Sequence, residues 1–361
     1  MTVNSTMEPD IEHFGAELKT DAVIIQPEEA RIIAKQYYGL DGKVDWLWGE
    51  KDSNYQLTLP DGNTYLLKIL NPGESQTVTS FHSQALMHVE SRDPTLPVQR
   101  IIPTLDGQAD FRIIDSAGQR RSVRVVSFVP GTAQNDTPTS AKQRYNAGRM
   151  LARLQLALED FTYDGVLSPI IWDMQHSLMM REFLPLVEDE TVRQRLQVAI
   201  NVFENEVIPV LDTLPIQVIH NDFNTDNILV NANEPDGVTG IIDFGDMVRA
   251  PALFDLAVAV SYQMGTDSNL IDEACDCLAG YASLKSLTEQ ELDLLYPAIV
   301  MRYVMRYTIA AWRSNIFPEK KAHLRRYWPT LLKQLDLLED IGRDAITARF
   351  KQACQEESTT W

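Results

Sequence analysis

Two neighbouring stretches decide the fold of this chain: residues 218–230 (VIHNDFNTDNILV) and residues 240–246 (GIIDFGD). Residues 228–230 and 238–242 are apolar and β-branched, which predicts two short strands. The sequence PDG at residues 235–237 predicts the turn that joins them into a β-hairpin. A hairpin brings its two outer ends together, so the polar residues beside those ends meet at one sheet edge.

Asn227 stands just before the first strand of this hairpin, and Asp243 just after the second. Amide and carboxylate oxygens are hard ligands that suit Mg²⁺, which takes one or two protein ligands plus phosphate oxygens and water. Asp222 lies five residues before Asn227, close enough to approach the same point. This spacing matches the H-R-D-x-x-x-x-N and D-F-G motifs of protein kinases, with Asn221 in the arginine position. The pattern predicts phosphoryl transfer, in which an acid orients the acceptor hydroxyl.

Upstream of the hairpin, residues 42–128 alternate β-rich runs with turn signals, which predicts an antiparallel sheet of about five strands carrying one helix at residues 75–90. Lys68 is the only lysine inside an apolar strand of this region (TYLLKIL, residues 64–70). Its apolar neighbours disfavour simple exposure, so we interpret it as a point charge for the α- and β-phosphates of ATP. The expected strands are residues 43–49, 54–59, 64–70, 100–105, 109–115 and 122–129.

Pro130-Gly131 ends the β pattern, and from residue 141 the apolar spacing predicts helices. The expected helices are residues 141–158, 188–213, 253–264, 269–284, 289–314 and 320–340. We expect an α+β, bilobal protein-kinase-like fold with a small antiparallel β lobe and a larger helical lobe. The expected divisions are an N-terminal tail at 1–22, a nucleotide-binding N-lobe at 23–131, and a catalytic and substrate-binding C-lobe at 132–361.

The composition limits the class of partner. The 361 residues carry 32 Lys+Arg against 51 Asp+Glu, a net charge of −19. Such acidity argues against nucleic acid and against an anionic membrane surface, because both need clustered basic residues. No apolar run is long enough to span a membrane, and residues 1–22 lack a secretory signal pattern. Three cysteines give no disulfide framework. We therefore expect a cytoplasmic protein, and the sequence carries no indication of its oligomeric state.

The chain resembles the aminoglycoside phosphotransferase/choline kinase superfamily of small-molecule kinases, and within it the hydroxylysine kinase-like subgroup, over about residues 38–338. The segments that carry the resemblance are 38–42 (YGLDG), 49–55 (GEKDSNY), 65–68 (YLLK), 127–131 (SFVPG), 172–174 (WDM), 220–230, 240–247 and 254–259 (FDLAVA). The resemblance implies ATP as the phosphoryl donor, Mg²⁺ as the metal, and a small molecule with a hydroxyl group as the acceptor.

By this resemblance Asp222 is the catalytic base, Asn227 and Asp243 bind Mg²⁺, Lys68 anchors the phosphates, and Asp255 supports the catalytic loop. The other implied nucleotide contacts are the backbone amides of Asp52, Ser53 and Asn54 at the phosphates and the hinge residues Ser127, Phe128 and Val129 at the adenine. We interpret His220 as a packing residue that ties the loop by hydrogen bonds.

Six further residues are candidates for acceptor binding: Asp246, Tyr262, Arg302, Arg306, Trp312 and Arg313. The three arginines are spaced by four and seven residues, on roughly one helix face. Their planar guanidinium suits a substrate carboxylate, although ion-paired or solvated arginines are the alternative interpretation. The aromatic residues are either core and rim residues or part of a cation-binding cage.

Two features depart from the family pattern. No G-x-G-x-x-G loop is present, since Gly49 stands alone, and the helix at residues 75–90 lacks the glutamate expected opposite Lys68. His82 or Gln84 is a candidate replacement. We predict a kinase for a small amine or amino acid, hydroxylysine-like or homoserine-like. The alternatives are a choline/ethanolamine or aminoglycoside kinase, or a nucleotide-binding pseudokinase with a regulatory role.

Overall fold

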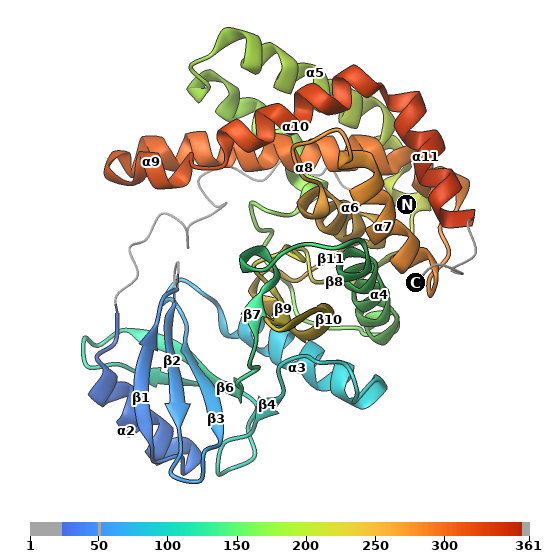
Figure 1. Ribbon diagram of the computed structural model, residues 1–361. Coiled ribbons are helices and arrows are strands. Elements are labelled where there is room, and N and C mark those ends of the chain that lie inside the picture. The colour runs from blue at the N-terminus through green and yellow to red at the C-terminus, as the bar shows by residue number, and fades with distance from the viewer. Residues whose placement is uncertain (1–23, 50–51, 356–361) are drawn as a thin grey trace, which may run out of the picture.

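The computed structural model describes residues 24–49 and 52–355 of the chain. A β-rich lobe adjoins a larger helical lobe, and the chain passes from one to the other after strand β6 (Figure 1). This is the two-lobed α+β architecture that the sequence predicts. The predicted tail at residues 1–22 lies outside the described residues.

One antiparallel sheet of six strands forms the small lobe, in the order β1-β2-β3-β6-β4, with β5 also paired to β6. Its strands are β1 (Lys43–Leu47), β2 (Ser53–Thr58), β3 (Thr64–Ile69), β4 (Ile101–Ile102), β5 (Phe111–Ile114) and β6 (Arg120–Ser127). Each of the six strands falls within or overlaps one of the six expected runs, and the run at residues 100–105 supplies only the short β4, which pairs with β6. Lys68 lies on β3, as predicted.

Two helices cover the opposite faces of this sheet (Figure 1). Helix α3 (Gln76–Arg92) matches the expected helix and packs its apolar side chains into the core of the helical lobe. Helix α2 (Pro27–Tyr38) was not expected from the sequence. It begins with proline in its first turn, ends at Gly39 in the left-handed conformation, and buries Ala30, Ile33 and Ala34 against the other sheet face. The small lobe therefore has a core of its own on one side only.

The helical lobe is built on helices whose positions largely follow the apolar spacing. They are α4 (Ala141–Leu158), α5 (Glu190–Glu206), α6 (Ala252–Gln263), α7 (Leu270–Ala282), α8 (Glu289–Ile316), α9 (Lys321–Leu324), α10 (Trp328–Ile341) and α11 (Arg343–Gln355). Two predictions were wrong here. The helix at 188–213 stops at Glu206, before Pro209, and the helix at 320–340 is interrupted before Pro329, since proline cannot continue a helix from the preceding turn.

The decisive hairpin consists of β9 (Ile228–Asn231) and β10 (Glu234–Ile241), and β7 (Thr132–Ala133) adds a third strand beside β9. Its turn falls at residues 232–233 and not at the predicted 235–237. The Asn231 side chain accepts a hydrogen bond from the Asn233 backbone, an Asx turn that fixes this position. Pro235 and Gly237 lie within β10, where the register shifts. An edge strand tolerates both residues.

A second antiparallel pair, β8 (Ile216–Ile219) with β11 (Val248–Pro251), frames the loop between β8 and β9. Within the described ranges 24–49 and 52–355, none of the helices combines the length and the apolar character that a membrane crossing requires.

Candidate active site

Asp255 of α6 fixes the loop between β8 and β9 by hydrogen bonds. Its carboxylate accepts hydrogen bonds from the backbone amides of His220 (3.1 Å) and Asn221 (2.8 Å), and its side chain is fully buried. Burial raises the pKa of Asp255, against the charge of His220 and these two bonds. Asn221 has a positive φ of 66°, so the chain reverses sharply just before Asp222. The loop is thus a fixed platform for Asp222.

His220 closes the same loop against the hairpin. Its Nε2 lies 3.0 Å from the Ile242 carbonyl, and its Nδ1 accepts from the Asp222 amide at 3.3 Å. The ring packs between Phe223 and Phe244. These contacts favour the packing interpretation of His220.

Asp222 and Asn227 meet as the spacing predicts. The Asn227 side-chain nitrogen donates to the Asp222 carbonyl and to Asp222 Oδ2, both at 2.9 Å. This orientation leaves Asn227 Oδ1 as the free acceptor of that amide. Asp243, with a φ of 61°, follows β10, and its side chain is half exposed to the cavity described below.

Arg302 of α8 contacts the same carboxylate from the other side. Its Nη2 donates to Asp222 Oδ1 at 2.8 Å, and the side chain is 2% exposed, with its guanidinium 4.7 Å from the centre of the Trp172 ring. Arg302 therefore occupies the ion-paired state that was the alternative to substrate binding. Both Asp222 oxygens have a donor, which fixes the plane of the carboxylate.

Lys68 is buried under the small lobe, and its Nζ lies 3.5 Å from Asp243 Oδ1 of the other lobe. The two residues considered as glutamate replacements lie on α3. His82 is buried in α3 beside Phe81, and Gln84 faces solvent. The ion-pair partner of Lys68 is thus Asp243, across the interlobe cleft.

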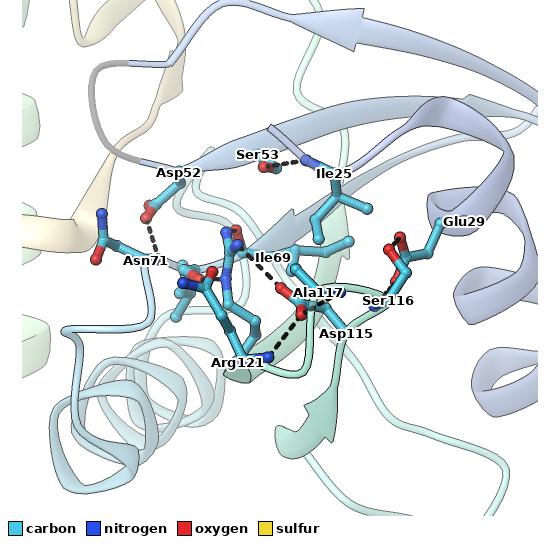
Figure 2. Close-up of polar contacts among 12 residues, drawn as sticks. Ile25, Glu29, Asp52, Ser53, Ile69, Asn71, Asp115, Ser116, Ala117 and Arg121 are labelled. Carbon is cyan, nitrogen blue, oxygen red and sulfur yellow. Dashed lines mark hydrogen bonds and ion pairs between the residues drawn. The ribbon is translucent and has the colours of Figure 1, made fainter. Parts of the chain in front are cut away.

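The predicted phosphate loop is anchored at its end by a buried polar network (Figure 2). Asp52 Oδ1 accepts from the Asn71 amide at 2.9 Å, and Ser53 Oγ accepts from the Ile25 amide at 3.1 Å. Ser53 and Asn54 already belong to β2, opposite Ile69 and Lys68 of β3. The Ser53 side chain is consequently turned away from the cavity. Glu50 and Lys51 of this loop lie outside the described residues.

The hinge after β6 has one uncommitted donor. The Ser127 amide donates to the Arg100 carbonyl (2.8 Å), and the Phe128 amide to the Thr64 carbonyl (3.3 Å). The Val129 amide has no partner in the part of the chain that the structure describes. It is the hinge N–H that remains available for an adenine.

A cavity of about 700 Å³ lies between the lobes and joins these parts. The expected residues that line it are Asp52, Asn54, Lys68, Asp222, Asn227, Asp243, Asp246, Tyr262, Arg302, Arg306 and Arg313. Ser53, Ser127, Phe128 and Val129 do not. Trp312 does not line it either, because its ring stacks on Phe183 in the core. The expected substrate contact of Trp312 is thus not supported by the structure.

The lining residues that sequence reasoning missed include Arg124, Asn135, His323, Arg326 and Tyr327. Arg124 carries a signal like that of Lys68, a single cation within an apolar strand (SVRVVS, residues 122–127). The others come from loops and short helices whose approach to the cavity depends on packing. No local sequence pattern predicts that these residues line the cavity.

Comparison with known proteins places the chain in a family. Residues 47–287 match the phosphotransferase enzyme family, described as APH, and the chain belongs to it. It is similar to hydroxylysine kinase of Danio rerio (26% identical, over 90% of this chain and 94% of that one) and of Mus musculus (27%; 88% and 90%). Homoserine kinase of Neisseria meningitidis is 24% identical over 75% of this chain and 83% of its own length.

Among solved structures, a microcompartment-associated aminopropanol kinase superposes with a TM-score of 0.64 at 18% identity, covering 84% of this chain and 98% of its own. An amicoumacin kinase in complex with AMP-PNP, Ca²⁺ and Ami gives a TM-score of 0.58 at 14% identity, covering 84% of this chain and 89% of its own. The protein is therefore a small-molecule kinase, an ATP-dependent phosphotransferase with an alcohol group as acceptor. The relatives do not favour the choline, aminoglycoside or pseudokinase alternatives.

Proposed function

We propose that this kinase phosphorylates the side-chain hydroxyl of a small amino acid, hydroxylysine-like or homoserine-like, with Mg²⁺ and in the cytoplasm. The observation that carries the proposal is the lining of the cavity. Lys68 contacts Asp243, Asp222 contacts Asn227 on one side and Arg302 of α8 on the other, and Arg306 and Arg313 follow on α8; all of them line the cavity. The names of the related hydroxylysine and homoserine kinases support an amino acid as acceptor.

The nucleotide lies between the proposed N-lobe, residues 23–131, and the proposed C-lobe, residues 132–361. Lys68 holds the phosphates as a point charge, and the Val129 amide donates to the adenine. Asp52 holds the end of the phosphate loop through its bond to Asn71. Lys68, Asp52 and Val129 thus have roles that their contacts allow, whereas the Ser53 side chain and the Ser127 and Phe128 amides serve the fold.

The residues at the hairpin end fit Mg²⁺. Asn227 Oδ1 and the half-exposed Asp243 carboxylate are hard oxygen ligands, as Mg²⁺ requires. No group of three or more His, Cys, Asp or Glu side chains within residues 24–49 and 52–355 is arranged to hold a metal unaided. That suits a cation held largely through nucleotide phosphates. When bound, Mg²⁺ neutralises charge that develops on the phosphate oxygens.

Asp222 orients the acceptor hydroxyl and accepts its proton as the acceptor oxygen bonds to the γ-phosphorus, while the bond from that phosphorus to the β,γ-bridging oxygen breaks and ADP leaves. Its carboxylate is positioned by Arg302 and Asn227, so the acceptor meets a group of fixed geometry. Phosphoryl transfer depends mainly on such positioning and on electrostatic stabilisation. Arg302 is on this view a positioning residue and not a substrate contact.

Arg306 is the arginine best placed for the acceptor carboxylate. It lies one turn after Arg302 on α8, about 6 Å further along the helix. Its guanidinium lies 4.1 Å from the Tyr262 ring centre and 5.8 Å from that of Tyr327, and it has no hydrogen bond or ion pair among the described residues. A half-buried guanidinium held by rings and free of acids suits bidentate carboxylate binding. Asp246, at the cavity wall, is proposed to face the amino group.

The test is a panel of acceptors measured by ADP release from the full chain with ATP and Mg²⁺. Hydroxylysine and homoserine are each compared with the amino alcohol that lacks the carboxylate, and choline and an aminoglycoside complete the panel. We expect kcat/KM to be higher for at least one amino acid than for its matched amino alcohol. Turnover confined to choline, aminoglycosides or the amino alcohols would show that the proposed acceptor class is wrong.

Arg306→Gln tests the carboxylate contact within that panel. We expect kcat/KM to fall about 10- to 100-fold for the amino acid and to stay within about twofold for the amino alcohol, because a charged hydrogen bond is lost only with the former. Arg325→Gln is the matched control. That arginine also stacks on an aromatic ring, Trp328 at 4.2 Å, but is committed to Glu188 at 3.0 Å and does not line the cavity. Equal losses on both acceptors would contradict the assignment.

A further inference from the structure

A second cation lies beside Lys68 in the small lobe. Arg124 of β6 is directly opposite Lys68 of β3 in the antiparallel register. Directly opposed residues carry their side chains on the same sheet face, with Cβ atoms about 5 Å apart. Both residues line the interlobe cavity, together with Asp52 and Asn54 of the phosphate loop region. The small lobe therefore presents two positive charges to the cavity.

Arg124 is buried and has no acceptor. The side chain is 3% exposed, and both Nε and Nη1 are shielded from solvent without a hydrogen-bond partner. No salt bridge or side-chain hydrogen bond of Arg124 is found in residues 24–49 and 52–355. This state is unusual, because a buried charge is ordinarily paired.

Arg121, three residues earlier on the same strand, shows what a structural arginine looks like in this lobe (Figure 2). It is fully buried, its Nε donates to the Leu70 carbonyl at 2.5 Å, and its Nη2 to the Ile69 carbonyl at 3.3 Å. Its Nη1 lies 3.5 Å from the Asp115 carboxylate. The same strand thus carries one arginine with a full set of acceptors and one without.

The unpaired state of Arg124 works against the free protein. A buried cation without a partner destabilises the folded state, and a like charge directly across the strand pair adds to that effect. The chain has 51 acidic residues, so carboxylates are abundant, yet none is within ion-pair distance of Arg124 among the described residues. An anion that enters the cavity would pair with Arg124 and remove this destabilisation. A structural arginine, in contrast, is already paired in the free protein.

We propose that Arg124 is a second phosphate anchor, which binds the phosphate chain of the nucleotide together with Lys68. The anion is phosphate and not the acceptor carboxylate, because Arg124 lies on the small lobe beside the phosphate loop, whereas the acceptor arginine is on α8 of the other lobe. The inference rests on the ATP-dependent activity of the family and is independent of the acceptor's identity.

Calorimetric titration of the full chain with adenosine, AMP and ADP, in the presence of Mg²⁺, tests this without any turnover. For Arg124→Met we expect ADP to bind about 10- to 100-fold more weakly, while adenosine stays within about twofold, because only phosphate contacts are lost. Arg124→Lys keeps the charge, so its affinity for ADP should lie between that of the natural chain and that of Arg124→Met. The member of the series at which the loss first appears identifies the phosphate that Arg124 contacts.

Thermal unfolding of the ligand-free proteins separates a binding role from a structural one. Arg124→Met replaces an unpaired charge with an apolar side chain of similar length, so its Tm should equal or exceed that of the natural chain. Arg121→Met should lower Tm, since it leaves the buried Asp115 carboxylate without its cation and removes the side-chain donors to the Ile69 and Leu70 carbonyls. ADP affinity unchanged in Arg124→Met, or equal weakening of ADP and adenosine, would overturn the proposal.

Discussion

At the scale of single residues, each oxygen of the Asp222 carboxylate accepts a hydrogen bond from a different side chain. Arg302 donates to one oxygen and Asn227 to the other, at 2.8 and 2.9 Å. For Asp222→Asn we expect kcat to fall by about 10²- to 10⁴-fold, because the proton acceptor is lost, while ADP binding persists. ADP release and calorimetry on the same sample measure both. A variant that keeps more than a tenth of the turnover would exclude Asp222 as the base.

The pair of Arg302 with Asp222 gives a separate prediction. Arg302→Met removes the guanidinium that fixes Asp222 Oδ1, so we expect kcat to fall about 10- to 100-fold with little change in the KM for ATP. Arg302→Lys should recover part of kcat, since the ammonium can still donate to the carboxylate. Steady-state kinetics with ATP varied checks the split. A rise in the KM for ATP with unchanged kcat would point to nucleotide binding instead.

Some residues of the site can be predicted from the sequence and others cannot. Asp222, Asn227, Asp243 and Lys68 were found because their spacing and apolar neighbours are local signals. Arg124 was missed although its neighbours are apolar too. Its significance depends on standing opposite Lys68, and strand register is set by packing and turn geometry, not by a local pattern.

At the scale of elements, α8 carries the acceptor end of the cavity and begins with a capping box. Thr288 Oγ1 accepts from the Glu291 amide, and the Glu291 side chain accepts from the Thr288 amide. Thr288→Ala should reduce the free energy of unfolding by about 1 kcal/mol, which lowers Tm by about 1–3 °C for a chain of this size. Differential scanning calorimetry measures the shift.

Activity is the internal control for this change. Arg302 lies 14 residues after Thr288, about 21 Å along the helix, so kcat/KM should be unaltered. Thr288→Ser keeps the hydroxyl and should keep Tm. If Thr288→Ala leaves Tm unchanged as well, the cap contributes nothing to stability.

Helices and turns were predicted correctly where a single sequence pattern determined them. The apolar spacing of residues 141–158 predicted α4 to the residue. The hairpin turn was misplaced because the chain offers two turn signals. Pro235-Asp236-Gly237 is strong by composition, but the turn is made by the Asx turn of Asn231, and the proline lies on an edge strand. Helix α2 was missed because its apolar face is short and is recognisable only with the sheet it covers.

At the scale of the whole molecule, the net charge of the chain does not describe the charge of its binding cavity. The chain as a whole carries a net charge of −19. The helical-lobe wall of the cavity combines Arg302, Arg306, Arg313 and Arg326 with Asp222, Asp226, Asp243 and Asp246. A local site can oppose the global field, so the position of each charge matters more for specificity than the sum.

The two lobes share part of one hydrophobic core, although the sequence pattern changes sharply between them. Sequence texture places the boundary at residue 131, but Phe81, Leu86 and Val89 of α3 belong to the core of the helical lobe, as does Val126 of β6. A separated small lobe would expose these side chains to water, at about 1.5–3 kcal/mol for each one. We therefore expect residues 24–131 alone not to fold cooperatively.

Far-UV and near-UV circular dichroism of that fragment during heating measures this directly. The full chain should unfold in a transition that includes the sheet, whereas the fragment should show no near-UV signal and no cooperative melt. Co-expression with residues 132–361 supplies the missing surface and should restore both. A fragment that melts cooperatively on its own would show that the sheet and α2 supply enough core, from Tyr55, Leu67 and Val125, to stand without the helical lobe.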